Sequence, residues 1–434
     1  MDSIWEKSIN RLSFPLLDGD TKTDVLIIGG GITGILCAHF LQCHGVDYVL
    51  VEADRICSGT TGKTTAKITF QHGLIYSKLM RVYGEEYAKM YLSANRDALD
   101  EYRKMCEKIN CNFLSADNYI YSLDNKDKIQ AECKALQNLG ADASFCVDTE
   151  LPFKIAGAVK VEAQACFHPL AFLYSVASGL NIKEWTKVTE LVPGKAKTNR
   201  GEIQYKKLIC ATHFPFINKH GFYFAKMYQH RSYAIALKKA PEINGMYMDE
   251  DKKGFSFRGA EDMLILGGSG HRTGKNCGGW NELNDMALHF YPGSRVVARW
   301  ATQDCITLDD VPYIGLYSKN TPKMLIATGF NKWGMTSAMV AAMLLADMII
   351  GKNNPYSAVF TPNRSILHPR LFSHLFSTVS SILTPAVPRC PHLGCALKYN
   401  KQEHSWDCSC HGSRFSKDGK LLDTPAQGDL PKKK

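Results

Sequence analysis

The sequence predicts an α/β protein built from more than one domain. A short apolar run starting at residue 24 ends in spaced glycines and leads into a segment with helical spacing. Residues 324–350 repeat this order of apolar strand, glycines and long apolar helix. Four cysteines crowd into residues 390–410. The 434 residues are enough for two or three domains.

The first glycine turn has the spacing of a phosphate-binding loop. Residues 24–34 read DVLIIGGGITG, with glycines at Gly29, Gly31 and Gly34. The first glycine permits a tight turn, the second lets a pyrophosphate approach the backbone, and the third lets helix and strand pack closely. Free amides and the positive end of the helix dipole then face the phosphates.

An acidic residue follows at the expected distance. The next predicted strand, YVLVE, ends at Glu52, twenty-one residues after Gly31. A carboxylate there accepts hydrogen bonds from the adenosine ribose hydroxyls. Strand, glycine turn, helix and acid in this order predict dinucleotide binding, and not a glycine turn used for packing alone. They do not separate FAD from NAD.

Later segments make that distinction. After Glu52 comes a Gly/Thr-rich stretch, ADRICSGTTGKTTAKITFQHG, and further on come DDVPYIG at 309–315 and ATGFNKWGMT at 327–336. With the fingerprint, these segments resemble the D-amino-acid oxidase and glycine oxidase superfamily of FAD-dependent oxidoreductases, over roughly residues 20–360. The resemblance implies a Rossmann-like FAD-binding domain interleaved with an antiparallel-sheet substrate domain.

The resemblance also implies domain boundaries and FAD contacts. The FAD-binding domain is expected at 20–90, 151–212 and 305–362, the substrate domain at 91–150 and 213–304, and a helix or linker at 363–387. The backbone of Val188 would meet the adenine. Lys332 is either a positive charge beside the flavin or a solvated loop lysine. The implied FAD-binding residues are Gly29, Gly31, Ile32, Thr33, Gly34, Glu52, Ser58, Gly59, Thr60, Thr61, Thr65, Val188, Gly329, Lys332, Gly334, Met335 and Thr336.

The substrate region departs from the family pattern. Amino-acid oxidases of this group carry W-A-G-L-R-P, in which the arginine grips the substrate carboxylate. This chain has WATQDC at 300–305, so Asp304 stands at the arginine position. A carboxylate there favours a cationic or neutral substrate, unless Asp304 is a loop carboxylate or helix cap outside the chamber.

No catalytic base stands out, because the flavin itself accepts a hydride equivalent in amine oxidation. The catalytic candidates are Lys67, Gln71 and His72 after the FAD loop, Asp304, and Tyr233, with His230 and Arg231 as further chamber candidates. Packing or surface charge explains each of these side chains equally well.

The C-terminal cluster predicts a metal site. Its pattern is Cys390-x-His392-x-x-Cys395, followed by Cys408-x-Cys410-His411, with fifteen residues between His392 and Cys408. Structural zinc also takes mixed cysteine and histidine ligands, so the spacing alone leaves zinc open.

The neighbouring residues PHLG and CHGS make this segment resemble a Rieske [2Fe–2S] domain, which implies a small all-β cluster domain, here shortened to about 388–434. The resemblance implies that Cys390 and Cys408 bind one iron and His392 and His411 the other. It also implies a disulfide between Cys395 and Cys410. A complete Rieske domain has several strands before its first ligand loop, and this segment lacks them. Docking on the flavoprotein would then supply the missing walls of the cluster site.

Composition excludes other functions. The net charge of +10 is spread along the chain, with a basic run only at the C-terminus, so nucleic acid is not expected. The longest apolar stretch, 337–350, is shorter than the roughly 20 residues of a membrane span. No secretory signal is visible, and we expect a cytoplasmic protein.

The sequence therefore predicts an FAD-dependent oxidoreductase, more a dehydrogenase than an oxidase. It would oxidise a small amine-type substrate and pass electrons through the cluster to a redox partner protein or another acceptor. One alternative is an oxidase with a structural tail holding zinc or no metal. The other is a redox sensor or electron-transfer protein without a small substrate.

Overall fold

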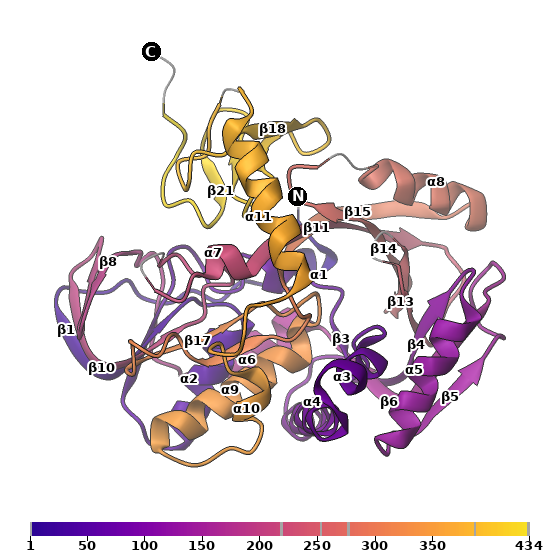
Figure 1. Ribbon diagram of the computed structural model, residues 1–434, viewed down its shortest axis with the longest axis horizontal. Helices are drawn as coiled ribbons and strands as arrows, with labels where there is room; N and C mark the ends of the chain where they lie inside the picture. The colour runs from indigo at the N-terminus through magenta and orange to yellow at the C-terminus, as the bar shows by residue number, and fades with distance from the viewer. Residues whose placement is uncertain (1, 218–219, 252–253, 276–277, 386–387, 432–434) are drawn as a thin grey trace.

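The computed structural model describes residues 2–217, 220–251, 254–275, 278–385 and 388–431. Within these ranges the chain forms three sheets, and each lies in a different part of the molecule (Figure 1). None of the helices in these ranges has both the length and the apolar character needed to cross a membrane. The predicted α/β architecture with a small all-β C-terminal part is confirmed.

The first sheet carries the fingerprint. Its central strand, β1 (Thr21–Ile28), is buried between two parallel neighbours, with Val25 opposite both Lys207 and Tyr48. Strands with neighbours on both sides and helices on their faces read as continuous apolar runs, which explains VLII. The order is β16 (Tyr313–Leu316), β17 (Met324–Thr328), β10 (Glu202–Cys210), β1, β2 (Tyr48–Val51) and β7 (Ile182–Lys183), while β8 (Val188–Val192) and β9 (Lys195–Thr198) extend β10.

Two apolar helices form the core beside this sheet. The fingerprint helix α2 (Ile32–Cys43) packs against α9 (Gly334–Ile350), the helix that follows the second glycine turn. Both are buried along most of their length, as expected for helices that are apolar on all sides. The two glycine turns, 300 residues apart in sequence, therefore meet at one place.

The second sheet lies beside the first and is mainly antiparallel (Figure 1). The apolar runs SYAIAL at 232–237 and MLILGG at 263–268 lie in two of its strands. Its order is β15 (Arg295–Thr307), β11 (Met227–Lys238), β14 (Met263–Arg272), β13 (Ser256–Ala260), β12 (Met246–Asp249), β4 (Leu114–Ser122), β6 (Gly157–Cys166) and β3 (Lys67–Ile68), and β5 (Ala143–Cys146) pairs with β6.

Segment 151–212, expected in the FAD-binding domain alone, supplies both sheets. Its strand β6 pairs with β4 and β3 of the second sheet, whereas β8, β9 and β10 belong to the first. After β4 and β5, the chain forms β6 antiparallel to β4 and then crosses to the first sheet. The remaining helices cover the two sheets: α1 (Ile4–Ser8), η1 (Thr60–Lys63), α3 (Ile75–Tyr83), α4 (Glu85–Cys106), α5 (Lys126–Asn138), α6 (Pro169–Ala177), α7 (Tyr223–Lys226), α8 (Trp280–Phe290) and α10 (Ser357–Phe360).

The C-terminal unit is a four-stranded antiparallel sheet. Its strands are β18 (Leu397–Asn400), β19 (Ser405–Cys408), β20 (Arg414–Ser416) and β21 (Leu421–Asp423), and they surround a small apolar core that includes Phe415. One helix, α11 (Pro369–Leu383), precedes the unit, as expected for the linker segment. In Figure 1 the unit and α11 sit together above α7 and β11.

Candidate functional site

The fingerprint glycines are required by close backbone approaches. A Cβ atom on Gly34 would lie 1.9 Å from the carbonyl oxygen of Gly29, because α2 and β1 touch there. Gly29 has a φ of +111°, and a Cβ on it would lie 2.6 Å from the carbonyl oxygen of Ala211, just after the end of the neighbouring strand β10. Gly31 is the N-cap of α2 and has no side chain to cap the first amides of the helix.

Glu52 lies at the end of β2 beside this turn. Its Oε2 accepts a hydrogen bond of 2.6 Å from the Gly30 amide, and Oε1 accepts one of 2.9 Å from the Asp54 amide. Burial raises the pKa of the carboxyl group, and these amide bonds oppose the rise. Glu52 is thus held at the place from which a ribose would be bound.

A single cavity of about 890 Å³ runs from the glycine turn to the second sheet. Every residue expected to bind FAD lines it except Gly34 and Thr336. Gly34 serves packing, and the Thr336 hydroxyl donates to the carbonyl oxygen of Thr69 at 3.1 Å. The Gly/Thr-rich loop folds over the start of α2, where Thr61 Oγ1 accepts a hydrogen bond from the Ile32 amide. An elongated cavity with open amides at one end fits FAD.

The second glycine turn forms the other end of the cavity. Gly329 has a φ of +74°, and a Cβ there would lie 2.3 Å from Thr307. Lys332 also adopts a positive φ, 73°, and lines the cavity just before α9 begins. The first amides of α9 and the Lys332 ammonium group place positive charge on this wall.

Three polar atoms of the cavity wall are candidates for hydrogen bonds to a ligand. Nε2 of His213, Oγ of Ser232 and Oγ1 of Thr302 are buried and have no hydrogen-bond partner within the described ranges. Buried polar groups normally find a partner, so this set marks a binding surface. Ser232 and Thr302 are directly opposite each other on β11 and β15.

Asp304 belongs to the same wall. It lies in β15 opposite His230, and both residues line the cavity. It is therefore not a loop carboxylate outside the chamber. Burial raises the pKa of Asp304, while His213, Lys332 and Arg231 oppose the rise.

Two of the three candidates after the FAD loop lie outside the cavity lining. Lys67 Nζ donates to the carbonyl oxygen of Tyr247 at 3.1 Å, and burial lowers the pKa of this amine to about 7. Gln71 bonds the carbonyl oxygen of Val159 and the amide of Asn118. These contacts give Lys67 and Gln71 structural roles, because both side chains connect strands.

His72 does line the cavity. Its Nδ1 lies 2.7 Å from the Tyr91 hydroxyl, and Nε2 lies 2.9 Å from both the Thr69 carbonyl oxygen and the Thr336 hydroxyl. The ring stacks on Trp333, with centroids 5.0 Å apart. Burial lowers the pKa of His72 to about 3, so the ring is neutral.

Alternation along β11 sends neighbouring side chains to opposite faces of the sheet. His230 and Ser232 face the cavity, whereas Arg231 and Tyr233 face the C-terminal unit. Arg231 forms a two-pronged ion pair with Glu403, and the Tyr233 hydroxyl donates to the same carboxylate at 3.1 Å. Arg231 was expected in the substrate chamber, but it lies outside the cavity lining. Tyr233 does line the cavity, while its hydroxyl group is directed to Glu403.

The cysteine and histidine loops meet at the edge of the C-terminal unit. The His392 and His411 ring centroids lie 4.9 Å apart, and Cys390 and Cys408 lie within one buried cluster. Bonds from the thiol of Cys408 and the hydroxyl of Ser413 help to lower the pKa of Cys390 to about 7. Burial lowers the pKa of His392 to about 4. Thiolate and neutral imidazole are the forms that bind metal.

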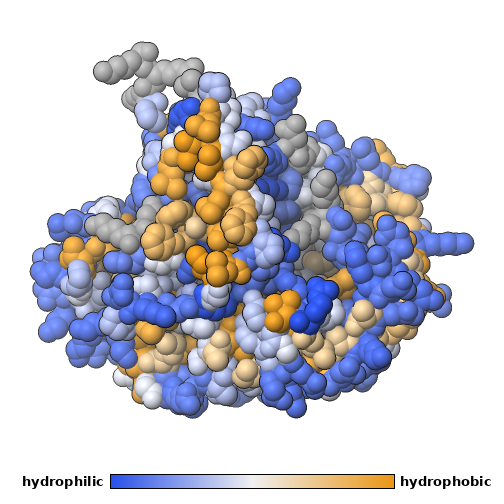
Figure 2. Space-filling model, in the orientation of Figure 1, coloured by the Kyte–Doolittle hydropathy of each residue, from blue (hydrophilic) through white to orange (hydrophobic). Residues whose placement is uncertain are grey.

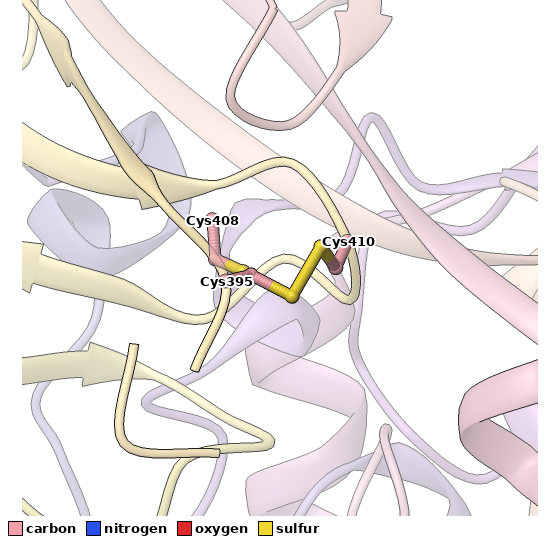
Figure 3. Close-up of side chains that lie close together, drawn as sticks. All are labelled: Cys395, Cys408 and Cys410. Atoms are coloured by element: carbon pink, nitrogen blue, oxygen red, sulfur yellow. A yellow bond between two sulfur atoms is a disulfide. The ribbon is translucent and has the colours of Figure 1, made fainter. Parts of the chain in front are cut away.

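The geometry also fits a cluster at this place. Nδ1 of His411 is buried without a hydrogen-bond partner in the part of the chain that the structure describes. Cys395 and Cys410 form a disulfide that joins the two loops, as the resemblance implied. Figure 3 shows Cys408 beside this pair, and the three sulfur atoms lie within 4.8 Å of one another. With two of them in the disulfide, Cys408 keeps its thiol.

The flavoprotein supplies a wall for this loop pair. Arg272 on β14 donates to the carbonyl oxygens of Ser409 and Cys410, at 2.9 and 3.0 Å. The same guanidinium group lies 2.9 Å from Nδ1 of His374 on α11. A Cβ on Gly274 would lie 2.6 Å from the Ser409 amide, so the two parts touch backbone to backbone.

A pair of glutamines joins the cavity to the cluster loop. Gln229 Nε2 donates to the carbonyl oxygens of His411 and Thr424, both at 2.8 Å. Gln303 Nε2 donates to Gln229 Oε1 at 2.7 Å and to the Gly412 carbonyl oxygen at 2.9 Å. Both glutamines line the cavity, and so do residues 422–424 of the C-terminal unit. One layer of side chains therefore separates the cavity from a predicted cluster ligand.

Sequence reasoning missed Gln229, Gln303, Arg272 and Glu403. One signal was present: β11 carries polar residues at successive positions from Gln229 to Ser232. A strand with polar side chains on both faces, inside a large protein, indicates that each face has its own binding partner.

Comparisons with known proteins agree with this geometry. A family model described as FAD dependent oxidoreductase matches residues 24–348, and one described as Rieske [2Fe-2S] domain matches residues 380–434. The Rieske 2Fe-2S iron-sulfur protein YhfW of Bacillus subtilis is 35% identical, over 98% of this chain and 96% of its own. Gamma-glutamylputrescine oxidoreductase of Escherichia coli is 22% identical over 82% of this chain and 90% of its own.

The fold is also found among solved structures. L-proline dehydrogenase from P. horikoshii superposes with a TM-score of 0.67 at 18% identity, covering 80% of this chain and 98% of that one. The two matched domains imply FAD and a [2Fe–2S] cluster as cofactors. The chain belongs to the FAD-dependent oxidoreductase family with the D-amino-acid oxidase fold, and it carries a C-terminal Rieske domain.

Proposed function

We propose that this protein oxidises a small amine-type substrate at its flavin site and that the electrons leave through the C-terminal unit to a separate acceptor. FAD takes two electrons from an organic substrate, and a [2Fe–2S] cluster carries one electron at a time. The observation that carries the proposal is the contact of Gln229, a residue of the cavity wall, with the backbone of His411 at 2.8 Å.

The proposed ligand set divides between two loops. Cys390 and His392 come from the first loop, and Cys408 and His411 from the second, with the disulfide of Cys395 and Cys410 holding the loops together. His411 is buried against the flavoprotein, where its ring meets Phe214 and Phe224 edge-on. Leu393, next to His392, is 39% exposed. The inner histidine thus faces the electron source and the outer loop faces the surroundings.

Asp304 supports an amine over a carboxylate substrate. The family's arginine binds a carboxylate, whereas a carboxylate in the same wall attracts an ammonium group. Ser232 and Thr302 would add hydrogen-bonding oxygens beside it. The name of the Escherichia coli relative, Gamma-glutamylputrescine oxidoreductase, agrees with a nitrogen-containing substrate.

A comparison of acceptors tests this proposal. The full-length protein, with FAD and iron, is given a panel of small amines, with oxygen or a one-electron ferricenium salt as acceptor. We expect ferricenium turnover to exceed oxygen turnover, and Cys408→Ser to abolish most of it while FAD stays bound. Rapid oxygen turnover that Cys408→Ser leaves unchanged would favour an oxidase with a structural tail. Full reduction by dithionite, with no turnover of any amine, would favour a redox sensor.

A further inference from the structure

Helix α11 exposes a largely apolar face, whereas an ordinary surface helix buries its apolar face. The side chains that it buries against the protein include His374 and Ser381, and the His374 ring lies within hydrogen-bond distance of Arg272 and of the Phe224 carbonyl oxygen. Of its apolar side chains, Leu371 is buried and most of the others point outwards. They recur at helical spacing on one face: Phe372, Leu375, Phe376, Val379, Ile382 and Leu383.

The exposure of this face is large. Phe372, Phe376 and Leu383 are 71%, 78% and 75% exposed, and Leu367, just before the helix, is 83% exposed. Figure 2 shows hydrophobic surface at the position that α11 occupies in Figure 1. A contiguous apolar patch of this kind on a folded protein marks an interaction surface, because leaving it in water is unfavourable.

The sequence interval that carries the stripe has charges of one sign. Between Asp347 and Glu403 the sequence contains no aspartate or glutamate. The lysines and arginines in that interval are Lys352, Arg364, Arg370, Arg389, Lys398 and Lys401. Three of these cations pair with aspartates of the flavoprotein, whereas Arg389 donates to backbone carbonyl oxygens. Lys398 is exposed three residues after Cys395 of the first ligand loop, and Lys401 is exposed at the turn between β18 and β19.

The stripe is joined directly to the cluster loop. The Arg389 guanidinium group donates to the carbonyl oxygens of Ile382 and Thr384 at the end of α11, and to that of Gly394 in the first ligand loop. The Ala396 amide donates to the Ser381 carbonyl oxygen at 3.2 Å. With Leu393 exposed next to His392, the helix and the outer loop form one surface.

We propose that the outer face of α11 binds the surface of a lipid bilayer that contains anionic lipids, with the helix lying in the plane of the interface. Phenylalanine and leucine side chains would enter the headgroup region, and the surrounding cations would meet the lipid phosphates. A second copy of this chain fits less well, because a two-fold interface would bring the same cationic rims together. A bilayer with anionic lipids accommodates both the apolar stripe and the cations of the same interval, of which Lys398 is exposed close to the first ligand loop.

Membrane docking places the outer ligand loop at the bilayer surface. If electrons leave by the cluster, which rests on the proposed function, their acceptor is then a membrane-borne carrier. Binding to vesicles requires no substrate and no electron transfer. Failure of the docking proposal is therefore distinguishable from failure of the proposed function.

Vesicle sedimentation tests the proposal with the full-length holoprotein. We expect it to sediment with vesicles of phosphatidylcholine and phosphatidylglycerol, and much less with phosphatidylcholine alone or at high salt. The double variant Phe372→Gln/Phe376→Gln should bind about tenfold or more weakly, because two large apolar side chains no longer enter the interface. Leu288→Gln on α8 is the matched control, since Leu288 is 75% exposed outside the stripe, and its binding should equal that of the unchanged protein.

FAD content and melting temperature check that each variant is folded. No binding to either vesicle type would overturn the proposal. Sedimentation analysis then identifies the occupant. A dimer that Phe372→Gln/Phe376→Gln converts to monomer would assign the stripe to an interface between copies, which also contradicts membrane docking.

Discussion

The carboxamide of Gln229 donates a hydrogen bond of 2.8 Å to the backbone carbonyl oxygen of His411. These residues are 182 positions apart in the chain. One lies in the wall of the flavin cavity, and the other is a proposed iron ligand. Gln303 supports the contact by donating to Gln229 and to the Gly412 carbonyl oxygen.

Replacement of Gln229 by methionine should slow reduction of the cluster by the flavin. Carbonyl groups of His411 and Thr424 would lose their donor in a buried place, at a cost of about 1–3 kcal/mol each, and the loop would shift from the cavity. We expect at least a roughly tenfold lower rate in anaerobic stopped-flow absorbance.

Gln402→Met is the matched control for this variant. Gln402 also joins the C-terminal unit to the flavoprotein, through Trp280 and Gly278, but it lies outside the cavity lining. Its cluster should be reduced at the normal rate. Equal rates in Gln229→Met and the unchanged protein would contradict a path at this contact.

Asp304 should make amine oxidation depend on pH. Burial raises its pKa, so the carboxylate that binds an ammonium group is lost as pH falls through this raised value. The kcat/KM for a cationic amine should therefore rise with pH through that range. Asp304→Asn should lower kcat/KM about 10- to 100-fold and remove this limb of the profile.

Asp262→Asn is the comparison variant, since Asp262 is an exposed residue that pairs with Lys238. Its pH profile should match that of the unchanged protein. An Asp304→Asn profile with the same acidic limb would show that another group titrates.

Glu403 should link docking of the C-terminal unit to pH. Burial raises its pKa, but Arg231 and Arg414 outweigh this effect and the pKa lies below its usual value. The stability from a depressed pKa is present above the unfolded-state pKa, about 4.3, and is lost as pH falls through the folded-state value. Thermal unfolding of the unchanged protein should show this loss in acid.

Glu403→Gln should destabilise the protein by about 3 kcal/mol at neutral pH, because buried Arg231 loses its nearest carboxylate and Arg414 keeps only Asp407 and Asp423. The variant should also lack the acidic loss that Glu403 causes. Glu162→Gln breaks an exposed pair with Lys160 and should change stability by less than about 1 kcal/mol. Equal effects of the two substitutions would refute a central role for Glu403.

Gly34→Ala should prevent FAD binding. The new Cβ would lie 1.9 Å from the Gly29 carbonyl oxygen, which forces α2 away from β1 and displaces the amides of the turn. Flavin absorbance per chain should fall to near zero. Gly428→Ala, where nothing lies within 4 Å, should keep full flavin content. Full occupancy in Gly34→Ala would argue against this cradle.

Local patterns predicted most of the parts, but not their connections. The glycine turn, Glu52 and the cysteine and histidine loops are short motifs whose spacing fixes their geometry. Asp304 was placed by alignment to a family motif and does line the cavity. The roles of Arg231 and Tyr233 depend on Glu403, 172 and 170 residues away, and no local signal identifies that pairing. Local sequence also does not show that segment 151–212 contributes strands to both sheets, because strand pairing is long-range.

The central claim is that electrons pass from the flavin to the cluster, and one experiment tests it most directly. The anaerobic holoprotein is analysed for iron and sulfide, and its EPR spectrum is then recorded after selective photoreduction of the flavin. We predict two irons per chain and a Rieske-type signal that grows as the flavin is reduced, and its absence in Cys408→Ser. Zinc in place of iron, or a cluster that dithionite reduces and the photoreduced flavin does not, would contradict the account.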